Sequence, residues 1–85
     1  MRIEYQTKAI KDLKAITSTD RARIISKIRQ YAQNPTSLAN QVKHLVGSPF
    51  HRLRVGDYRV IFSVSDEVAA IMLVERVRHR REAYD

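Results

Sequence analysis

The stretch RLRVGDYRVIFSV, residues 52–64, alternates apolar and polar residues on both sides of a glycine–aspartate pair. Alternation with a period of two predicts β-strands, and Gly56-Asp57 is typical of a two-residue hairpin turn. Such a turn fixes the strand pairing by counting outward, so that Arg54 faces Arg59. Two faces follow: an apolar face that should pack on helices, with Leu53, Val55, Tyr58, Val60 and Phe62, and a basic face with Arg52, Arg54 and Arg59.

Further strands are predicted around this hairpin. The segments FHRLRV (50–55), YRVIFSV (58–64) and VAAIMLVERVR (68–78) are rich in Val, Ile, Phe and Leu, as strands are. Within the connection 36–49, VKHLVG is a candidate for one more short strand. A two-residue turn at Asp66-Glu67 would place Arg76 and Arg78 on the basic face and Glu75 on the opposite face.

The first half of the chain predicts a strand and two helices. RIEY (2–5) is the strand, and TSTD (17–20) separates the helices and offers capping side chains. Asn34-Pro35 ends the second helix. The expected apolar stripes are Ile10, Leu13 and Ile16 in the first helix, and Ile24, Ile25, Ile28, Tyr31 and Ala32 in the second.

These elements predict one α+β domain over residues 1–85. Its order is β-α-α-β-β-β: an N-terminal strand and a two-helix hairpin packed on a small antiparallel sheet of three or four strands. A short helical turn is expected at the C-terminus, around Glu82–Tyr84.

Composition narrows the function classes. The net charge is +7 and the pI about 10.3, which favours nucleic acid, ribosomes or another polyanion as the partner. The absence of cysteine excludes disulfides and thiolate nucleophiles. His44 and His51 show no metal-ligand spacing, so neither a metal site nor a cofactor is predicted. The longest apolar run, residues 68–74, is too short to span a bilayer, and we expect a cytoplasmic protein.

The basic face is unusual as pure structure because like charges across a sheet destabilise it. Arginine suits bidentate contact with phosphate, so the pattern favours an anion site, with a solvated charged face as the alternative. Repulsion between Arg54 and Arg59 predicts that Arg59→Leu raises the melting temperature. Tyr84 either caps the core or stacks on a nucleobase. The last ten residues, RVRHRREAYD, add Arg80, Arg81, His79 and Tyr84 to Arg76 and Arg78.

The element order, the segment RLRVGDYRVIFSV and the ending VRHRREAY together resemble the RelE/ParE superfamily of toxins from toxin–antitoxin systems, the RelE branch in particular. The resemblance implies a ribosome-dependent endoribonuclease that cleaves messenger RNA in the A site and inhibits translation. A ribose 2′-hydroxyl attacks the adjacent phosphate and leaves a 2′,3′-cyclic phosphate and a 5′-hydroxyl. The implied partners are a cognate antitoxin, the ribosome and messenger RNA.

The resemblance also implies roles for individual residues. Arg52 and Arg54 match a basic pair before the hairpin, Arg59 would clamp the scissile phosphate, Arg78 would stabilise the leaving oxygen, and Tyr84 would orient the target base. Where several relatives carry lysines, this chain has Phe50 and Arg52. Arginine does not deprotonate, so the open candidates for proton acceptor are His79, Tyr84 and His51. Two alternatives remain: a ParE-like inhibitor of DNA gyrase and a non-catalytic RNA-binding module.

Overall fold

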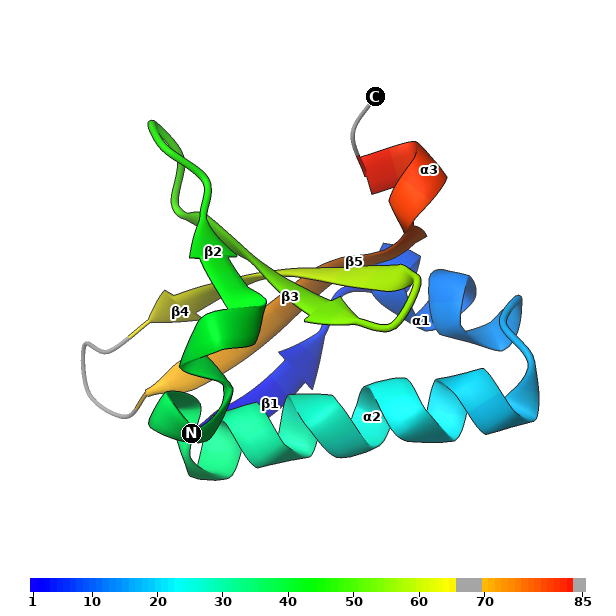
Figure 1. Ribbon diagram of the computed structural model, residues 1–85, viewed down its shortest axis with the longest axis horizontal. Helices are drawn as coiled ribbons and strands as arrows, with labels where there is room; N and C mark the ends of the chain where they lie inside the picture. Colours follow the sequence, from blue (N-terminus) through cyan, green and yellow to red (C-terminus); the bar gives the residue numbers. More distant parts are fainter. Residues whose placement is uncertain (66–69, 84–85) are drawn as a thin grey trace.

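The computed structural model describes residues 1–65 and 70–83 and shows an α+β fold with one twisted sheet (Figure 1). The strand order is β1-β5-β4-β3-β2, with β1 parallel to β5 and the other neighbours antiparallel. The predicted fold class is confirmed, and β1 joins the sheet through its parallel pairing with β5. The elements are β1 (Arg2–Tyr5), α1 (Thr7–Lys14), α2 (Ser18–Gln33), the 3-10 helix η1 (Pro35–Gln41), β2 (Val42–His44), β3 (Phe50–Val55), β4 (Tyr58–Ser65), β5 (Ile71–His79) and α3 (Arg80–Ala83).

The central hairpin of β3 and β4 forms as its sequence predicts. Gly56 adopts φ +57°, a left-handed conformation that glycine reaches without strain. Val55 pairs with Tyr58 and Arg54 with Arg59, so the predicted register is confirmed. The short strand expected within 36–49 is also present, as β2.

Helix α2 covers one face of the sheet and closes the core (Figure 1). Ile24, Ile28 and Ala32 are buried, and the ring of Tyr31 lies 4.9 Å from that of Phe62. The predicted stripe of this helix is confirmed. The helix ends at Gln33, before Pro35, which cannot continue its hydrogen-bond ladder.

Helix α1 departs from its predicted stripe. Ala9 and Leu13 are buried, whereas Ile10 is 41% exposed. The helix has eight residues and packs against β5 through a narrow face, which turns Ile10 toward solvent. The hairpin of helices is fastened by Arg21, whose guanidinium donates to the carbonyl oxygens of Leu13 and Ile16 at 2.8 Å each.

The register between β4 and β5 differs from the predicted one. Ser65 pairs with Ile71 rather than Val68, a shift of three residues. An odd shift alone would turn Arg76 and Arg78 toward the helices, because side chains alternate along a strand. The predicted turn residues, Asp66 and Glu67, lie outside the described residues.

A β-bulge at Glu75 reverses the effect of that shift. Ile61 pairs with Arg76 while the next residue, Phe62, pairs with Val74, so Glu75 is the extra residue. Val74 and Val77 both point into the core, and the two residues between them point outward. Arg76 and Arg78 therefore share the face of Arg59 as predicted. The predicted placement of Glu75 on the opposite face is wrong, because it lines a pocket together with Ile61 and Arg76.

Asp12 joins α1 to the edge of β5 just beyond the end of β1. Its carboxylate accepts hydrogen bonds from Arg76 Nε at 2.8 Å, from Arg76 Nη2 at 3.1 Å and from the backbone N–H of Val77 at 2.9 Å. Burial raises the pKa of Asp12, but the hydrogen bonds from Arg76 and Val77 and the nearby arginine charges outweigh it and leave the pKa below its usual range. The ionised carboxylate thus stabilises the fold.

We predict that Asp12→Asn lowers the free energy of unfolding by about 1.5–3 kcal/mol at pH 7, the usual range for hydrogen bonds to a charged group. A lowered folded-state pKa means that this stabilisation is complete above the ordinary value of 3.8 and is lost as the pH falls further. Urea denaturation from pH 7 to pH 3 should therefore show the two proteins converging in acid.

Glu4→Gln is the matched control, because Glu4 is 49% exposed and pairs only with Arg2 among the described residues. Its effect should stay below about 1 kcal/mol. A mutant–wild-type difference that does not shrink in acid would show that Asp12 acts by packing and not by charge.

Candidate nucleic-acid interface

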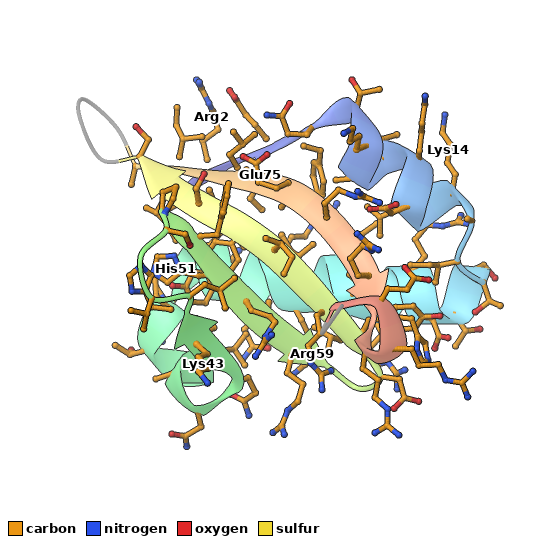
Figure 2. All side chains as sticks on the ribbon, turned by 90° about the horizontal axis from the view of Figure 1, so that it is seen from above. Arg2, Lys14, Lys43, His51, Arg59 and Glu75 are labelled. Carbon is orange, nitrogen blue, oxygen red and sulfur yellow. The ribbon has the colours of Figure 1, made fainter. Side chains whose placement is uncertain are left out.

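The face of the sheet opposite α2 is open. Helix α3 and the connection between β2 and β3 rise from the sheet on that side, away from α2 (Figure 1). Figure 2 looks onto this open face, with Lys43, Arg59 and Glu75 labelled. The side chains that point to it come from β2, β3, β4 and β5.

A row of three arginines crosses the open face. Arg54 pairs with Arg59 across β3 and β4, and Arg59 pairs with Arg78 across β4 and β5. Directly opposed residues on one sheet face have Cβ atoms about 4.5–5.5 Å apart. The row therefore places three arginines at neighbouring positions on one face, a pattern that suits a phosphate oxyanion.

Arg59, at the centre of this row, is held by the backbone. It is only 8% exposed, and its Nη1 donates to the carbonyl oxygens of Gly56 and Tyr58 at 3.0 Å each. Within residues 1–65 and 70–83 no carboxylate lies within 4.0 Å of it. The hairpin therefore orients this guanidinium without neutralising its charge.

The other arginines of the C-terminal segment differ in their partners. Arg78 Nε contacts Glu82 Oε2 at 3.0 Å, but Glu82 is 56% exposed, so a phosphate can compete for Arg78 at small cost. Arg80 lies 4.0 Å from Asp57, and Arg81 is exposed. Arg76 is occupied by Asp12, which leaves it less available for the phosphate contact expected from the sequence.

Lys43 belongs to this surface and was missed by the sequence analysis. It pairs with Arg52 across β2 and β3. A pocket of about 200 Å³ brings these two side chains together with Arg54 and Arg59. The segment VKH at 42–44 could have indicated Lys43, but its pairing with β3 is not evident from composition. The full lining of this basic pocket is Asn40, Gln41, Val42, Lys43, Arg52, Arg54 and Arg59.

Neither candidate histidine lies with the arginine row. His79 pairs with Tyr58 and meets its ring edge-on at 5.5 Å, on the helix side of β5. Its Nδ1 also accepts the backbone N–H of Arg81 at 3.3 Å. His51 stacks on Phe62 at 5.3 Å, and burial, with the charge of His44, lowers the pKa of His51. Tyr84 lies outside the described residues.

A known protein family matches almost the whole chain. Residues 3–84 match the family described as the ParE toxin of type II toxin–antitoxin systems, parDE. The chain belongs to this family, and so to the RelE/ParE superfamily. None of the curated proteins compared with it is similar enough to count as a match.

Solved structures of toxins in this superfamily share the fold. A chain of the RelB–RelE antitoxin–toxin complex from Methanococcus jannaschii is 28% identical, with a TM-score of 0.74 over 96% of this chain and 95% of that one. A chain of the RelE–RelB complex from Pyrococcus horikoshii OT3 is 23% identical, with a TM-score of 0.77 over 93% of each chain. The isolated RelE toxin of E. coli is 22% identical, with a TM-score of 0.75 over 98% and 94%.

The buried position of Arg59 in this ParE-family toxin reverses the stability expected from strand pairing alone. We predict that Arg59→Leu lowers the free energy of unfolding by about 1–2 kcal/mol, because two hydrogen bonds to carbonyl oxygens outweigh the relief of about 0.2–1 kcal/mol from cross-strand repulsion. Urea denaturation at about 0.01 M and about 1 M salt tests this, since screening removes only the repulsion. The deficit of the mutant should be larger at high salt, and a mutant more stable than wild type at low salt would contradict it.

Proposed function

We propose that this toxin is a ribosome-dependent endoribonuclease that cleaves messenger RNA in the A site without a metal ion or cofactor and thereby stops translation. Residues 1–85 act as one toxin domain in the cytoplasm, where ribosomes translate. The row of Arg54, Arg59 and Arg78 on an open sheet face is the observation that carries it. Within the RelE/ParE superfamily, structural likeness to RelE toxins supports cleavage of messenger RNA over inhibition of gyrase.

Arg59 and Arg78 have distinct tasks at the reacting phosphate. Arg59, oriented by the hairpin carbonyls, contacts the non-bridging oxygens and stabilises the charge that develops on phosphorus. Arg78 leaves Glu82 and stabilises the leaving 5′-oxygen as a charge and hydrogen-bond donor. Tyr84 orients the target base. Lys43, Arg52, Arg54, Arg80 and Arg81 hold the flanking phosphates, while Arg76 supports the site through Asp12.

The proton of the attacking 2′-hydroxyl needs a separate acceptor, because arginine stays protonated. His79 is the titratable side chain nearest in sequence to Arg78, yet its ring packs on Tyr58 on the other face of β5. We therefore propose that His79 positions α3 through Arg81, and that a group of the ribosome or Tyr84 accepts the proton. His79→Ala should then lower the cleavage rate less than the general-base contribution of about 10²-fold.

We predict codon-periodic cleavage of a translated message and little cleavage of the same RNA without ribosomes, measured by primer extension. Arg59→Leu should lower the single-turnover rate by about 10²–10³-fold, the usual effect of removing one oxyanion donor. Arg78→Ala should also lower the single-turnover rate, and this variant leaves the buried Arg59 in place.

Arg2→Ala is the control, because Arg2 is exposed on β1 and pairs with Glu4, away from the row. Its rate should equal that of wild type. Inhibition of gyrase supercoiling with intact message would instead establish the ParE-like alternative, and RNA binding without cleavage would establish a non-catalytic module.

The proposed antitoxin would bind the helical hairpin. A groove of about 300 Å³ between α1 and α2 has an apolar floor that includes Ile10, Leu13 and Ile25 and a rim that carries Lys14 and Arg29. An amphipathic segment with acidic flanks fits such a groove. The related RelE chains were solved in complexes with RelB antitoxins, which supports a protein partner of this kind.

We predict that Ile10→Ser weakens binding of the antitoxin by about tenfold or more, because a central apolar contact in an interface is worth over 1 kcal/mol. Isothermal titration calorimetry with the purified antitoxin measures the change. Val46→Ser is the control, since Val46 is 95% exposed and lies in the connection between β2 and β3. Equal weakening by both variants would exclude the helical groove as the specific site.

A further inference from the structure

A second pocket, of about 580 Å³, continues the arginine row along the open face. Ile61 lies two residues from Arg59 on β4, and Phe50 lies two residues from Arg52 on β3, so both pairs share the face. Two residues along a strand span about 6.8 Å. The pocket is lined by Gln6, Thr7, Lys8, Phe50, Ile61, Glu75 and Arg76.

The chemistry of this pocket differs from that of the arginine row. Phe50 and Ile61 are half-buried and give it an apolar, partly aromatic floor. The bulge turns the carboxylate of Glu75 into it. Arg76 is already paired with Asp12, and in the described part of the chain Glu75 has no cation within 4.0 Å. A hydrogen-bond acceptor thus stands beside an aromatic surface.

A phosphate group suits this pocket less well than the basic pocket, because the carboxylate of Glu75 repels it. Among the described residues, the exposed Lys8 is the one cation of the lining not paired with a carboxylate. An apolar side chain from a protein partner suits it poorly, because it would bury that carboxylate without a donor. A nucleobase can contact the aromatic floor and also donate a hydrogen bond to the carboxylate. Its flat face can stack on Phe50, a contact that proteins use for all four bases, and an exocyclic amino group can donate to Glu75 as cytosine donates to carboxylates elsewhere.

We propose that this pocket binds the base of a nucleotide next to the phosphate held by Arg59. Glu75 selects there for a base with an exocyclic amino group, which is adenine, cytosine or guanine, over uracil. The O4 and O2 atoms of uracil are acceptors, and it offers only its N3–H as a donor. This inference rests on the proposal that the toxin binds RNA, and it assigns a nucleotide preference to that site.

Binding can be tested apart from cleavage. Tetranucleotides with 2′-O-methyl groups lack the attacking hydroxyl and remain intact, and one position at a time is varied among the four bases. In an NMR titration of the wild-type protein with these oligonucleotides, the amide signals of Gln6, Thr7 and Glu75 should shift. The size of the shifts should depend on the base at one of the four nucleotide positions. Oligonucleotides with an amino-bearing base there should bind about tenfold more tightly than those with uracil, the value of about one hydrogen bond to a charged group.

Two variants separate the roles of the pocket residues. Glu75→Gln should reduce the preference to about threefold or less, because an amide can donate to O4 of uracil as well as accept from an amino group. Phe50→Leu should weaken all four oligonucleotides about equally, by roughly 5–100-fold, because stacking is insensitive to base identity. Glu4→Gln is the matched control and should keep the wild-type preference.

The outcomes are distinct. A preference that survives Glu75→Gln, or pocket amides that do not respond to any oligonucleotide, would overturn the inference. A response of the pocket to an antitoxin peptide alone would assign it to the protein partner and overturn it too. If the preference holds and ribosome-dependent cleavage is absent, the base pocket stands and the nuclease proposal fails.

Discussion

The β-bulge at Glu75 is the feature on which the open face depends. The pairing of Ser65 with Ile71 lies three residues away from the pairing that a two-residue turn would give, and this shift by itself would send Arg76 and Arg78 toward the core. One extra residue restores the outward direction and lets Val77 fill the core position that follows Val74. The same residue also carries a carboxylate onto a face that is otherwise basic. A single backbone irregularity thus sets the arginine row, the Asp12 contact and the second pocket.

Some arginines of the chain stabilise the fold, and others face the solvent on the open face. Arg21 caps the end of α1, and Arg76 holds α1 to the sheet edge through Asp12. Arg59 is the intermediate case, since carbonyl oxygens fix its direction and leave its full charge for a ligand. Partial charges on backbone oxygens orient a guanidinium at lower cost to anion binding than a carboxylate would. This arrangement explains how like charges can face one another across the sheet in a folded protein.

The sequence predicted the parts of the fold that local rules determine. Gly56-Asp57 and the alternation over residues 52–60 predicted the β3–β4 register, and Pro35 predicted the end of α2. The predicted β5 register failed because it assumed a two-residue turn at Asp66-Glu67, whereas Ser65 pairs with Ile71. The bulge that returns Arg76 and Arg78 to the predicted face has no compositional signature. The Asp12–Arg76 contact joins residues 64 positions apart, so periodicity offers no sign of it. Lys43 was missed because a three-residue strand is too short to show alternation, and Ile10 was misplaced because a two-turn helix buries a narrow stripe.

The composition of the open face has a chemical consequence for the proposed reaction. Its cations, Lys43, Arg52, Arg54, Arg59 and Arg78, supply charge and hydrogen-bond donors, and the arginines do not take up a proton near neutral pH. Both described histidine candidates, His51 and His79, pack against aromatic rings away from the row. The arginines of this face can stabilise a developing negative charge but cannot take the proton from a 2′-hydroxyl. Under the proposed function, dependence on the ribosome then follows from chemistry as well as from positioning: the larger particle must align the RNA for in-line attack and, unless Tyr84 does so, accept the proton.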